Sequence, residues 1–310
     1  MLAQDLRSRL YIAGGPGGNS IGPKVHEYIS KSLGLNWTCE FLQLASVDDV
    51  MKLFRAPDFA GGIVTMPHKR TIIPLLDHCD DLVRILGACN FVFLGEDGRL
   101  HGTNTDWLGI YDSILTQSPD HIPGRCSMVY GAGGASRAAI YALWAKLQCD
   151  KIYVINREDL EVEELLNDIH QQPGLYWPTI IHVKSIAEAR QLQPPHYIVS
   201  TVPDFEAITS QEIEARDILV DFLMRGQGAN GLMLDMCYHP PMTRNLRLAI
   251  DHGYSIIQGF TVVASQFSPQ WKLWTGETIE ISKVFQITEQ LVKKQELAAQ
   301  IDSVVVRVRY

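Results

Sequence analysis

The sequence predicts an α/β protein of two domains, and three features of the 310-residue chain support this class. Short apolar runs alternate with segments of helical periodicity, a pattern typical of parallel sheets covered by helices. A glycine turn near residue 131 joins one apolar run to an alanine-rich helix, as in a βαβ unit. A break rich in proline and glycine, residues 118–124, separates the two halves. The length also suits two domains.

The N-terminal half begins with a predicted strand over residues 10–13, and a glycine-rich loop follows it. Pro23 opens the next helical segment, because proline suits the first turn of a helix. We expect a second strand over residues 37–42, a helix over 47–54 and a third strand over 62–65. Strands and helices therefore alternate, which predicts a mainly parallel sheet.

A β-hairpin is predicted after the third strand. Its strands cover residues 85–94 and 100–102, and an acidic turn with two glycines, residues 95–98, connects them. The hairpin leads to Asp106, and the helical segment 107–115 follows as a connector. Considered alone, Asp106 would most often be a helix cap.

The second half contains the glycine turn of residues 131–134. The apolar strand 127–130 precedes it, and an alanine-rich helix to about Lys146 follows, then a second strand over 151–157. This arrangement is typical of the βαβ unit of a Rossmann-type dinucleotide-binding domain. Further strands are expected over residues 197–200, 218–221, 232–235 and 255–257.

A helical pattern from Ile281 to about Gln300 closes the chain. The tail beyond it, residues 303–310, alternates valine with arginine. We interpret this tail as an added strand, a partner contact or a frayed end.

The composition excludes several classes of protein. The net charge of −8, without runs of like charge, argues against a nucleic-acid or anionic-membrane partner, since phosphate binding needs a basic surface. The 6 cysteines lie far apart in no ligand or disulfide pattern, which predicts free thiols, no metal and a reducing compartment. The N-terminus lacks the apolar stretch of a signal peptide, and no window reaches transmembrane length. We expect a cytoplasmic protein, a monomer or homodimer, with a small-molecule ligand.

The glycine turn suits a dinucleotide, because Gly131 and Gly133 let backbone amides approach a pyrophosphate at a helix N-terminus. Ser136 stands where the usual fingerprint has a third glycine, so a tight turn without a ligand is the alternative. The end of the second strand normally discriminates NAD from NADP. Arg157 there would stack on adenine or bind a 2′-phosphate, but Glu158 and further carboxylates follow it. Their negative charge favours NAD, with NADP as the alternative.

The order of several motifs resembles the shikimate/quinate dehydrogenase family. These motifs lie between Ile12 and Gly276 and read VTMPHK, GACN, GTNTD, GAGGASRAA, NR, STVPDF, MLDMCYHP, a late glutamine and WTG. The combination of VTMPHK, GACN, VPDF and MLDMCYHP is most similar to the fungal quinate dehydrogenase branch. The resemblance implies an N-terminal α/β substrate domain over residues 1–115, a Rossmann-type NAD(P)-binding domain over 116–262 and a C-terminal helical segment, 263–310, that returns to the first domain.

The same resemblance implies an NAD(P)-dependent dehydrogenase that oxidises a ring hydroxyl of quinate or shikimate, and that reversibly reduces the corresponding 3-dehydro acid. Lys69 would take the hydroxyl proton as the hydride leaves for the nicotinamide, with Asp106 beside it and both residues touching the ring hydroxyl that is oxidised. The substrate-binding positions of the family fall on Ser20, Thr65, Asn90, Tyr238 and Gln266. Its cofactor contacts fall on Gly131, Ala132, Gly133, Gly134, Ala135, Asn156, Arg157, Thr201, Met236 and Gly259.

One departure from the family pattern concerns the carboxylate of the substrate. The family has two serines around a small spacer before a proline, whereas this chain has Ser20 and Gly22. The loss of one hydroxyl would weaken binding by about 1–3 kcal/mol unless water or Asn19 replaces it. The alternative function is a non-catalytic sensor or regulator of the same metabolites, and retention of Lys69 and Asp106 argues against it.

Overall fold

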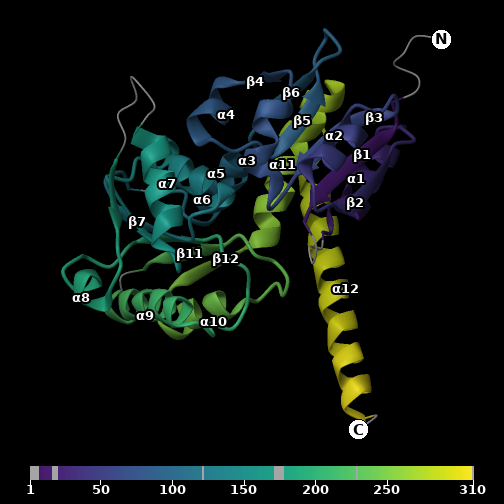
Figure 1. The fold of residues 1–310 in the computed structure, drawn as a ribbon. Helices are drawn as coiled ribbons and strands as arrows, with labels where there is room; N and C mark the ends of the chain where they lie inside the picture. Colours follow the sequence, from purple (N-terminus) through teal and green to yellow (C-terminus); the bar gives the residue numbers. More distant parts are fainter. Residues whose placement is uncertain (1–6, 16–19, 121, 171–177, 228–229, 309–310) are drawn as a thin grey trace.

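A computed structural model describes residues 7–15, 20–120, 122–170, 178–227 and 230–308. Two six-stranded sheets lie in separate halves of the chain, each with covering helices (Figure 1), so the predicted α/β class is confirmed. Within these residues, no helix combines the length and the hydropathy that a membrane-spanning helix needs.

The first sheet has the strand order β2-β1-β3-β5-β6-β4. Its parallel half consists of β1 (Arg9–Gly14), β2 (Thr38–Gln43) and β3 (Phe59–Val64), which confirms the three predicted strands. The antiparallel hairpin of β5 (Phe91–Leu94) and β6 (Leu100–Thr103) extends the sheet from β3. This hairpin too was predicted, although its first strand is shorter than expected.

A short helix occupies the start of the predicted hairpin. This helix, α4 (Asp81–Leu86), begins where the Asp80 carboxylate accepts the backbone N–H of Val83 at 2.8 Å. It ends at Gly87, whose φ of 62° is a backbone conformation that favours glycine. The short strand β4 (His78–Cys79) precedes α4 and pairs with β6 in parallel.

Helices connect the strands of the first half. The predicted helices are present as α1 (Gly22–Ser32) and α2 (Val47–Phe54), and the Ser46 hydroxyl caps α2 by accepting a backbone N–H. After β3 the chain turns into α3 (His68–Thr71) and a 3₁₀ turn (Ile73–Leu75). The chain therefore folds back over the end of β3 directly after the VTMP run.

The second sheet is entirely parallel and has the order β12-β11-β10-β7-β8-β9. This order is the one of the doubly wound, Rossmann-type fold, as predicted. Every strand except β9 was predicted. Along the chain the strands are β7 (Cys126–Tyr130), β8 (Lys151–Ile155), β9 (Thr179–His182), β10 (Tyr197–Ser200), β11 (Leu232–Asp235) and β12 (Ser255–Gln258).

Helices bury both faces of the second sheet (Figure 1). One face packs against α5 (Asp106–Gln117), α6 (Gly134–Tyr141), its π-helical continuation (Ala142–Lys146) and α7 (Asp159–His170). The other face packs against α8 (Ile186–Ala189), α9 (Ser210–Arg225) and α10 (Arg244–Asp251). The carboxyl ends of the strands, where Rossmann-type folds bind ligands, therefore remain at one edge between these layers.

The predicted strand over residues 218–221 is wrong, because this segment lies inside α9. Thr209 and Glu212 form a capping box at the start of that helix. The buried side chains of α9 recur at helical spacing at Ala215, Ile218, Leu219, Phe222 and Leu223. A four-residue apolar run does not distinguish a strand from a buried helix, whereas the longer window does.

Helix α11 (Gly259–Thr275) returns to the first half, as predicted for the C-terminal segment. It crosses α5 at Gly109, where an added Cβ would lie 2.5 Å from a backbone oxygen of α11. Further along α11, Trp274 lies against Gly61 of the first sheet and stacks on Phe91, with ring centroids 4.7 Å apart. This one helix therefore contacts both halves of the molecule.

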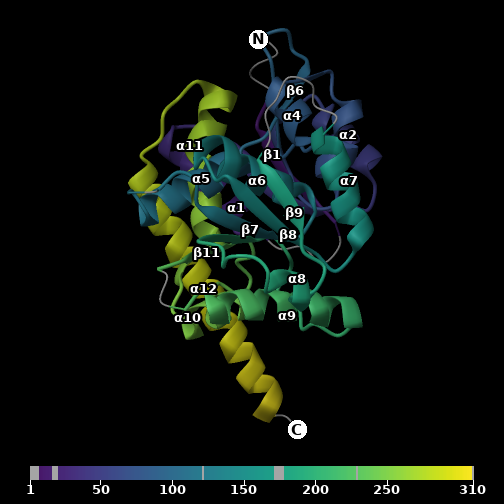
Figure 2. The same ribbon diagram turned by 90° about the vertical axis from the view of Figure 1, so that its left-hand side faces the viewer.

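Helix α12 (Ile281–Val308) packs on α1 and α11 and then projects beyond the rest of the chain in two perpendicular views (Figures 1 and 2). It includes residues 303–308, so the interpretation of the tail as a strand is wrong, and residues 309–310 lie outside the described residues. The predicted domain limits at residues 115 and 262 fall inside α5 and α11, and the division into domains stays a prediction.

A buried histidine joins α1 to α11. His26 is fully buried, and its Nδ1 accepts a hydrogen bond from Nε1 of Trp271 at 3.1 Å. Burial lowers the pKa of His26 from 6.5 to about 3. The imidazole is therefore neutral in the folded protein near pH 7.

This pKa difference predicts acid sensitivity. The unfolded chain binds the His26 proton below its ordinary pKa of 6.5, but the folded chain does not until about pH 3. The contribution of the neutral His26 to the unfolding free energy is therefore complete above pH 6.5, and it is lost as the pH falls below this value. Between pH 7 and pH 5, we expect wild type to lose about 2 kcal/mol more unfolding free energy than His26→Gln, in urea titrations.

The comparison with the variant is necessary because the carboxyl of Asp235 acts in the opposite direction. Burial raises its pKa from 3.8 to about 6, so protonation of this group stabilises the folded state over the same pH range. Both proteins contain Asp235, and its effect cancels in the difference. Parallel pH profiles for wild type and His26→Gln would contradict the assignment.

Candidate active site

Lys69 and Asp106 meet although they are far apart in the sequence. Lys69 lies in α3, directly after the VTMPH run, and Asp106 is the first residue of α5. The Lys69 Nζ and Asp106 Oδ2 atoms are 2.5 Å apart. The two side chains are 14% and 6% exposed, so this ion pair is largely shielded from water. The pairing that the motifs imply is thus present in the structure.

A buried amide network holds the second oxygen of Asp106. The Asn90 side-chain amide donates to Asp106 Oδ1 at 2.8 Å and to the Gln266 side-chain oxygen at 3.0 Å. The Asn90 oxygen in turn accepts the backbone N–H of Thr105 at 2.7 Å. Asn90 precedes β5 and Gln266 lies on α11, so the hairpin and the returning helix together position the carboxylate.

Two members of this network were not predicted. The Thr105 hydroxyl donates to Gln266 at 2.7 Å and accepts from the Gln270 amide at 3.0 Å. Gln270 is 3% exposed. One signal for it exists in the sequence, because Gln270 follows Gln266 by one helical turn and shares its face of α11.

The predicted substrate residues Ser20 and Tyr238 also lie together. The Tyr238 phenol is half-buried and hydrogen-bonds with Ser20, and burial, the larger effect, raises its pKa above 10. The Ser20 hydroxyl accepts the backbone N–H of Gly22 at 3.0 Å. Thr65 lies at the end of β3, where its N–H donates to Ala13 and its carbonyl accepts the N–H that opens α3. Chain segments from both halves therefore contribute to this region.

Gly22, where the resemblance implies a second serine, has Ile12 beside it. A Cβ at residue 22 would collide with the Ile12 Cδ1 atom and lie 3.0 Å from the Ser20 hydroxyl oxygen. Ile12 is 4% exposed. Ile12 therefore fills the space that a side chain at residue 22 would need, and Asn19 lies outside the described residues.

The glycine turn has the shape that a pyrophosphate needs. Gly131 has a φ of 120°, and a Cβ there would collide with the Thr201 hydroxyl. Gly133 is exposed, and its added Cβ would meet no atom within 4 Å. Backbone amides at the start of α6 therefore face open space, and the residues fit the phosphates of a dinucleotide.

Ser136, which replaces the third glycine of the fingerprint, has a partner in the structure. Its hydroxyl lies 2.7 Å from the Thr201 hydroxyl, which donates to the Tyr130 carbonyl at 3.0 Å. The serine thus joins the start of α6 to the end of β10. This departure from the fingerprint stabilises the turn and does not obstruct it.

The ion pair and the glycine turn lie next to each other. A Cβ on Gly134 would be 3.3 Å from Lys69 Cβ and 3.4 Å from Lys69 Cδ. Gly134 opens α6 between Gly133 and Ala135, and the predicted residue Ala132 lies two positions before it. The lysine stem therefore lies against the N-terminus of the helix that would face a pyrophosphate.

Ion pairs beside Lys69 connect the two halves. Arg70 of α3 contacts Asp168 of α7 at 3.2 Å and Glu164 at 3.3 Å. Asp168 also contacts Arg137 of α6 at 2.6 Å, and the Arg137 side chain is 3% exposed. The residue next to Lys69 is thus anchored to a helix of the second sheet.

The remaining predicted cofactor residues lie at the carboxyl edge of the second sheet. The Asn156 amide donates to Glu161 at 2.7 Å, and Arg157 donates to Glu212 at 2.8 Å. Met236 follows β11, and Gly259 opens α11, where a Cβ would lie 2.6 Å from the Met236 carbonyl oxygen. These residues share an edge with the glycine turn because the strands are parallel.

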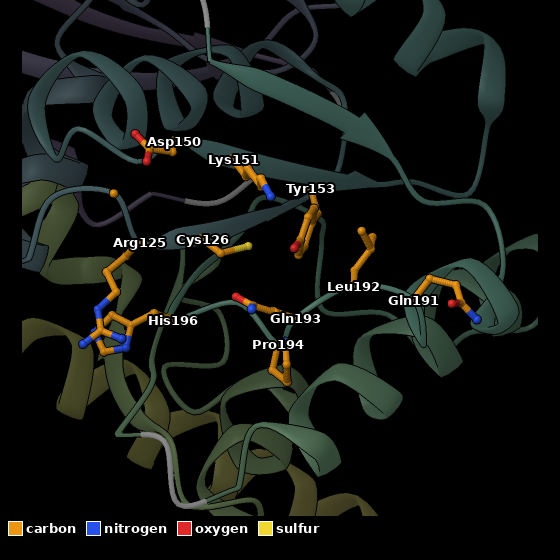
Figure 3. Close-up of a pocket in the computed structure, with 11 residues that line it drawn as sticks. Arg125, Cys126, Asp150, Lys151, Tyr153, Gln191, Leu192, Gln193, Pro194 and His196 are labelled. Atoms are coloured by element: carbon orange, nitrogen blue, oxygen red, sulfur yellow. The ribbon is translucent and has the colours of Figure 1, made fainter.

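A separate cavity of about 540 Å³ lies at the opposite edge of the second sheet (Figure 3). Cys126, Lys151 and His196 line it, at or next to the amino ends of β7, β8 and β10. The Cys126 thiol has its pKa raised by burial, which makes it a poor nucleophile. This cavity contains none of the predicted site residues.

Comparisons with known proteins agree with this geometry. Residues 12–92 match the family model "Shikimate dehydrogenase substrate binding domain". The chain is 35% identical over 289 residues to quinate dehydrogenase of Emericella nidulans, covering 87% of this chain and 88% of that protein.

Two solved structures extend the likeness to the whole fold. Shikimate dehydrogenase from Aquifex aeolicus is 26% identical with a TM-score of 0.72, covering 94% of this chain and 99% of that one. Quinate dehydrogenase from Corynebacterium glutamicum, solved in complex with NAD, is 21% identical with a TM-score of 0.72. The match covers 90% of this chain and 97% of that one, and at this identity it shows a likeness of fold alone. On the strength of the fungal relative and the matching N-terminal model, the chain belongs to the shikimate/quinate dehydrogenase family of oxidoreductases.

Proposed function

We propose that this chain is an NAD(P)-dependent dehydrogenase that oxidises a secondary ring hydroxyl of quinate, shikimate or a similar cyclic hydroxy-acid. The reaction is reversible, so the chain also reduces the corresponding 3-dehydro acid. One observation carries the proposal: Lys69, paired with Asp106 and shielded from water, has its side-chain stem against Gly134 at the glycine turn. The lysine then lies beside the turn that would hold the coenzyme, so both can act on one secondary alcohol: its hydroxyl proton goes to Lys69 and the hydride on its carbon goes to the nicotinamide.

The residues at the carboxyl edge of the second sheet would hold the coenzyme. The amides of residues 131–135 would bind the pyrophosphate, Asn156 and Arg157 would face the adenosine half, and Thr201, Met236 and Gly259 would surround the nicotinamide half. The relative from Corynebacterium glutamicum was solved with NAD. The bound nicotinamide supplies the hydride acceptor. The carboxylates around Arg157 favour NAD over NADP.

Lys69 would move the proton of the reacting hydroxyl. In oxidation the neutral form of its amine accepts that proton as the hydride leaves the carbon that bears the hydroxyl, and in reduction the ammonium returns the proton to that oxygen. Asp106 orients the amine through the 2.5 Å contact, while Asn90 fixes the carboxylate from its other side. The surrounding buried network reduces the freedom of both groups.

Ser20, Thr65, Asn90, Tyr238 and Gln266 would bind the substrate. Hydroxyl and amide groups suit a ring acid with several hydroxyls, because each buried hydroxyl needs a hydrogen-bond partner. The Ser20–Tyr238 pair would face the carboxylate. Gly22 would lack the second hydroxyl there and Ile12 fills the adjacent space, which supports a substrate preference different from that of relatives with two serines.

The same Ile12–Gly22 arrangement favours one alternative function, a non-catalytic sensor of such acids. A panel of NAD or NADP with quinate or shikimate separates the two functions by the absorbance of reduced nicotinamide. We expect turnover with at least one combination. Ligand binding in calorimetry without turnover in any of the four would contradict the dehydrogenase and support the sensor.

The role of Lys69 predicts a selective loss of turnover. Lys69→Ala removes the proton acceptor but no group that binds the coenzyme, so kcat is expected to fall about 100-fold or more. The Kd for NAD should stay within about twofold. Lys52→Ala is the matched control, since Lys52 is 76% exposed on α2. Equal kcat in the two variants would rule out the assigned role.

Because Ile12 fills the space beside Gly22, we predict that the effects of substitutions at these two residues depend on each other. Gly22→Ser alone would collide with Ile12 and lower the unfolding free energy by about 1–3 kcal/mol. Gly22→Ser with Ile12→Val makes room for the hydroxyl, and we expect about a tenfold lower KM for the preferred acid. Ile12→Val alone is the control. A KM unchanged in the double variant would show that residue 22 does not face the carboxylate.

A further inference from the structure

Glu212 lies at the edge of the second sheet where the coenzyme would bind. It is the third residue of α9, which follows β10 and runs back from the carboxyl ends of the strands. One carboxylate oxygen, Oε2, accepts the backbone N–H groups of Ile208 and Thr209, both at 3.1 Å. The other oxygen, Oε1, accepts a hydrogen bond from Arg157 at 2.8 Å. Glu212 therefore caps its own helix and holds a side chain from beyond β8.

Arg157 is surrounded by negative charge. Its hydrogen bond to Glu212 is the main reason that its pKa is raised, and Glu161 and Glu158 act in the same direction. The Asn156 amide beside it donates to Glu161 and to the Glu158 carbonyl. Both polar groups at the end of β8 thus already have partners within the protein.

Helix capping fixes Glu212 in this position. The two backbone N–H groups and Arg157 lower the pKa of Glu212 from 4.5 to about 2. The carboxylate is therefore charged at every pH at which the protein would be assayed. Because the same side chain closes the capping box with Thr209, Glu212 stays beside Arg157 for as long as the start of α9 is folded.

We propose that Glu212 is a coenzyme-specificity residue, which withholds Arg157 from the 2′-phosphate of NADP and so directs the chain to NAD. This inference rests on the proposed function, in which Arg157 faces the adenosine half of the coenzyme. A 2′-phosphate carries up to two negative charges and would have to displace Glu212 while it approaches Glu158 and Glu161. The uncharged ribose hydroxyl of NAD meets no such repulsion.

Direct binding to the whole chain tests this proposal. Glu212→Gln keeps the capping box, which accepts glutamine at this position, but removes the charge that holds Arg157. In calorimetric titrations we expect its Kd for NADP to fall about five- to tenfold, while the Kd for NAD stays within about twofold. Glu214→Gln removes one exposed charge from the same helix turn and should leave the ratio of the two Kd values unchanged.

A double variant shows whether the gain acts through Arg157. In Glu212→Gln, the further change Arg157→Ala should cancel the gain in NADP affinity. Urea denaturation of each variant checks that α9 remains folded. An unchanged Kd ratio in Glu212→Gln, or a gain that survives Arg157→Ala, would overturn the assignment of Glu212 while NAD binding still supports the dehydrogenase. If neither nucleotide binds wild type, the proposed function and this inference both fail.

Discussion

The buried carboxylate of Asp106 is the group on which the candidate site depends. A carboxylate removed from water needs partners for both oxygens, because an unpaired buried charge is costly. Here Lys69 contacts one oxygen and Asn90 donates to the other. Asn90 is itself held by Gln266 of the returning helix. Four segments distant in the sequence therefore have to be folded correctly before the lysine amine has a defined position.

The two halves of the molecule contact each other around Lys69, and these contacts help to fix the position of the lysine. Gly134 leaves room for the lysine stem at the start of α6, and Arg70 anchors α3 to α7 through Asp168. Helix α11 crosses α5 closely at Gly109 and continues onto the first sheet. The Lys69–Asp106 pair is thus built from the first half, and its lysine stem lies against the glycine turn of the second. Together these contacts give one site from two sheets.

Local patterns predicted much of this arrangement, and long-range pairing accounts for the rest. Alternating apolar runs and glycine turns predicted both sheets, and ordered motifs predicted that Lys69 and Asp106 lie side by side. The run at residues 218–221 looked like a strand because its helical period appears only in a longer window. The Arg157–Glu212 pair joins residues 55 positions apart and depends on strand order, which no local pattern contains. The contact between Ile12 of β1 and Gly22 of α1 likewise depends on how these two elements pack, which no local pattern contains.

A crystal structure of the chain with NAD and quinate tests the central claim most directly, since it would show where the reacting carbon lies. Our account predicts the Lys69 amine within about 3.2 Å of one ring hydroxyl, whose carbon faces the nicotinamide ring. Asp106 would lie beside the amine and touch the same hydroxyl. A ring bound away from Lys69, or a nucleotide bound elsewhere than at the 131–135 turn, would contradict it.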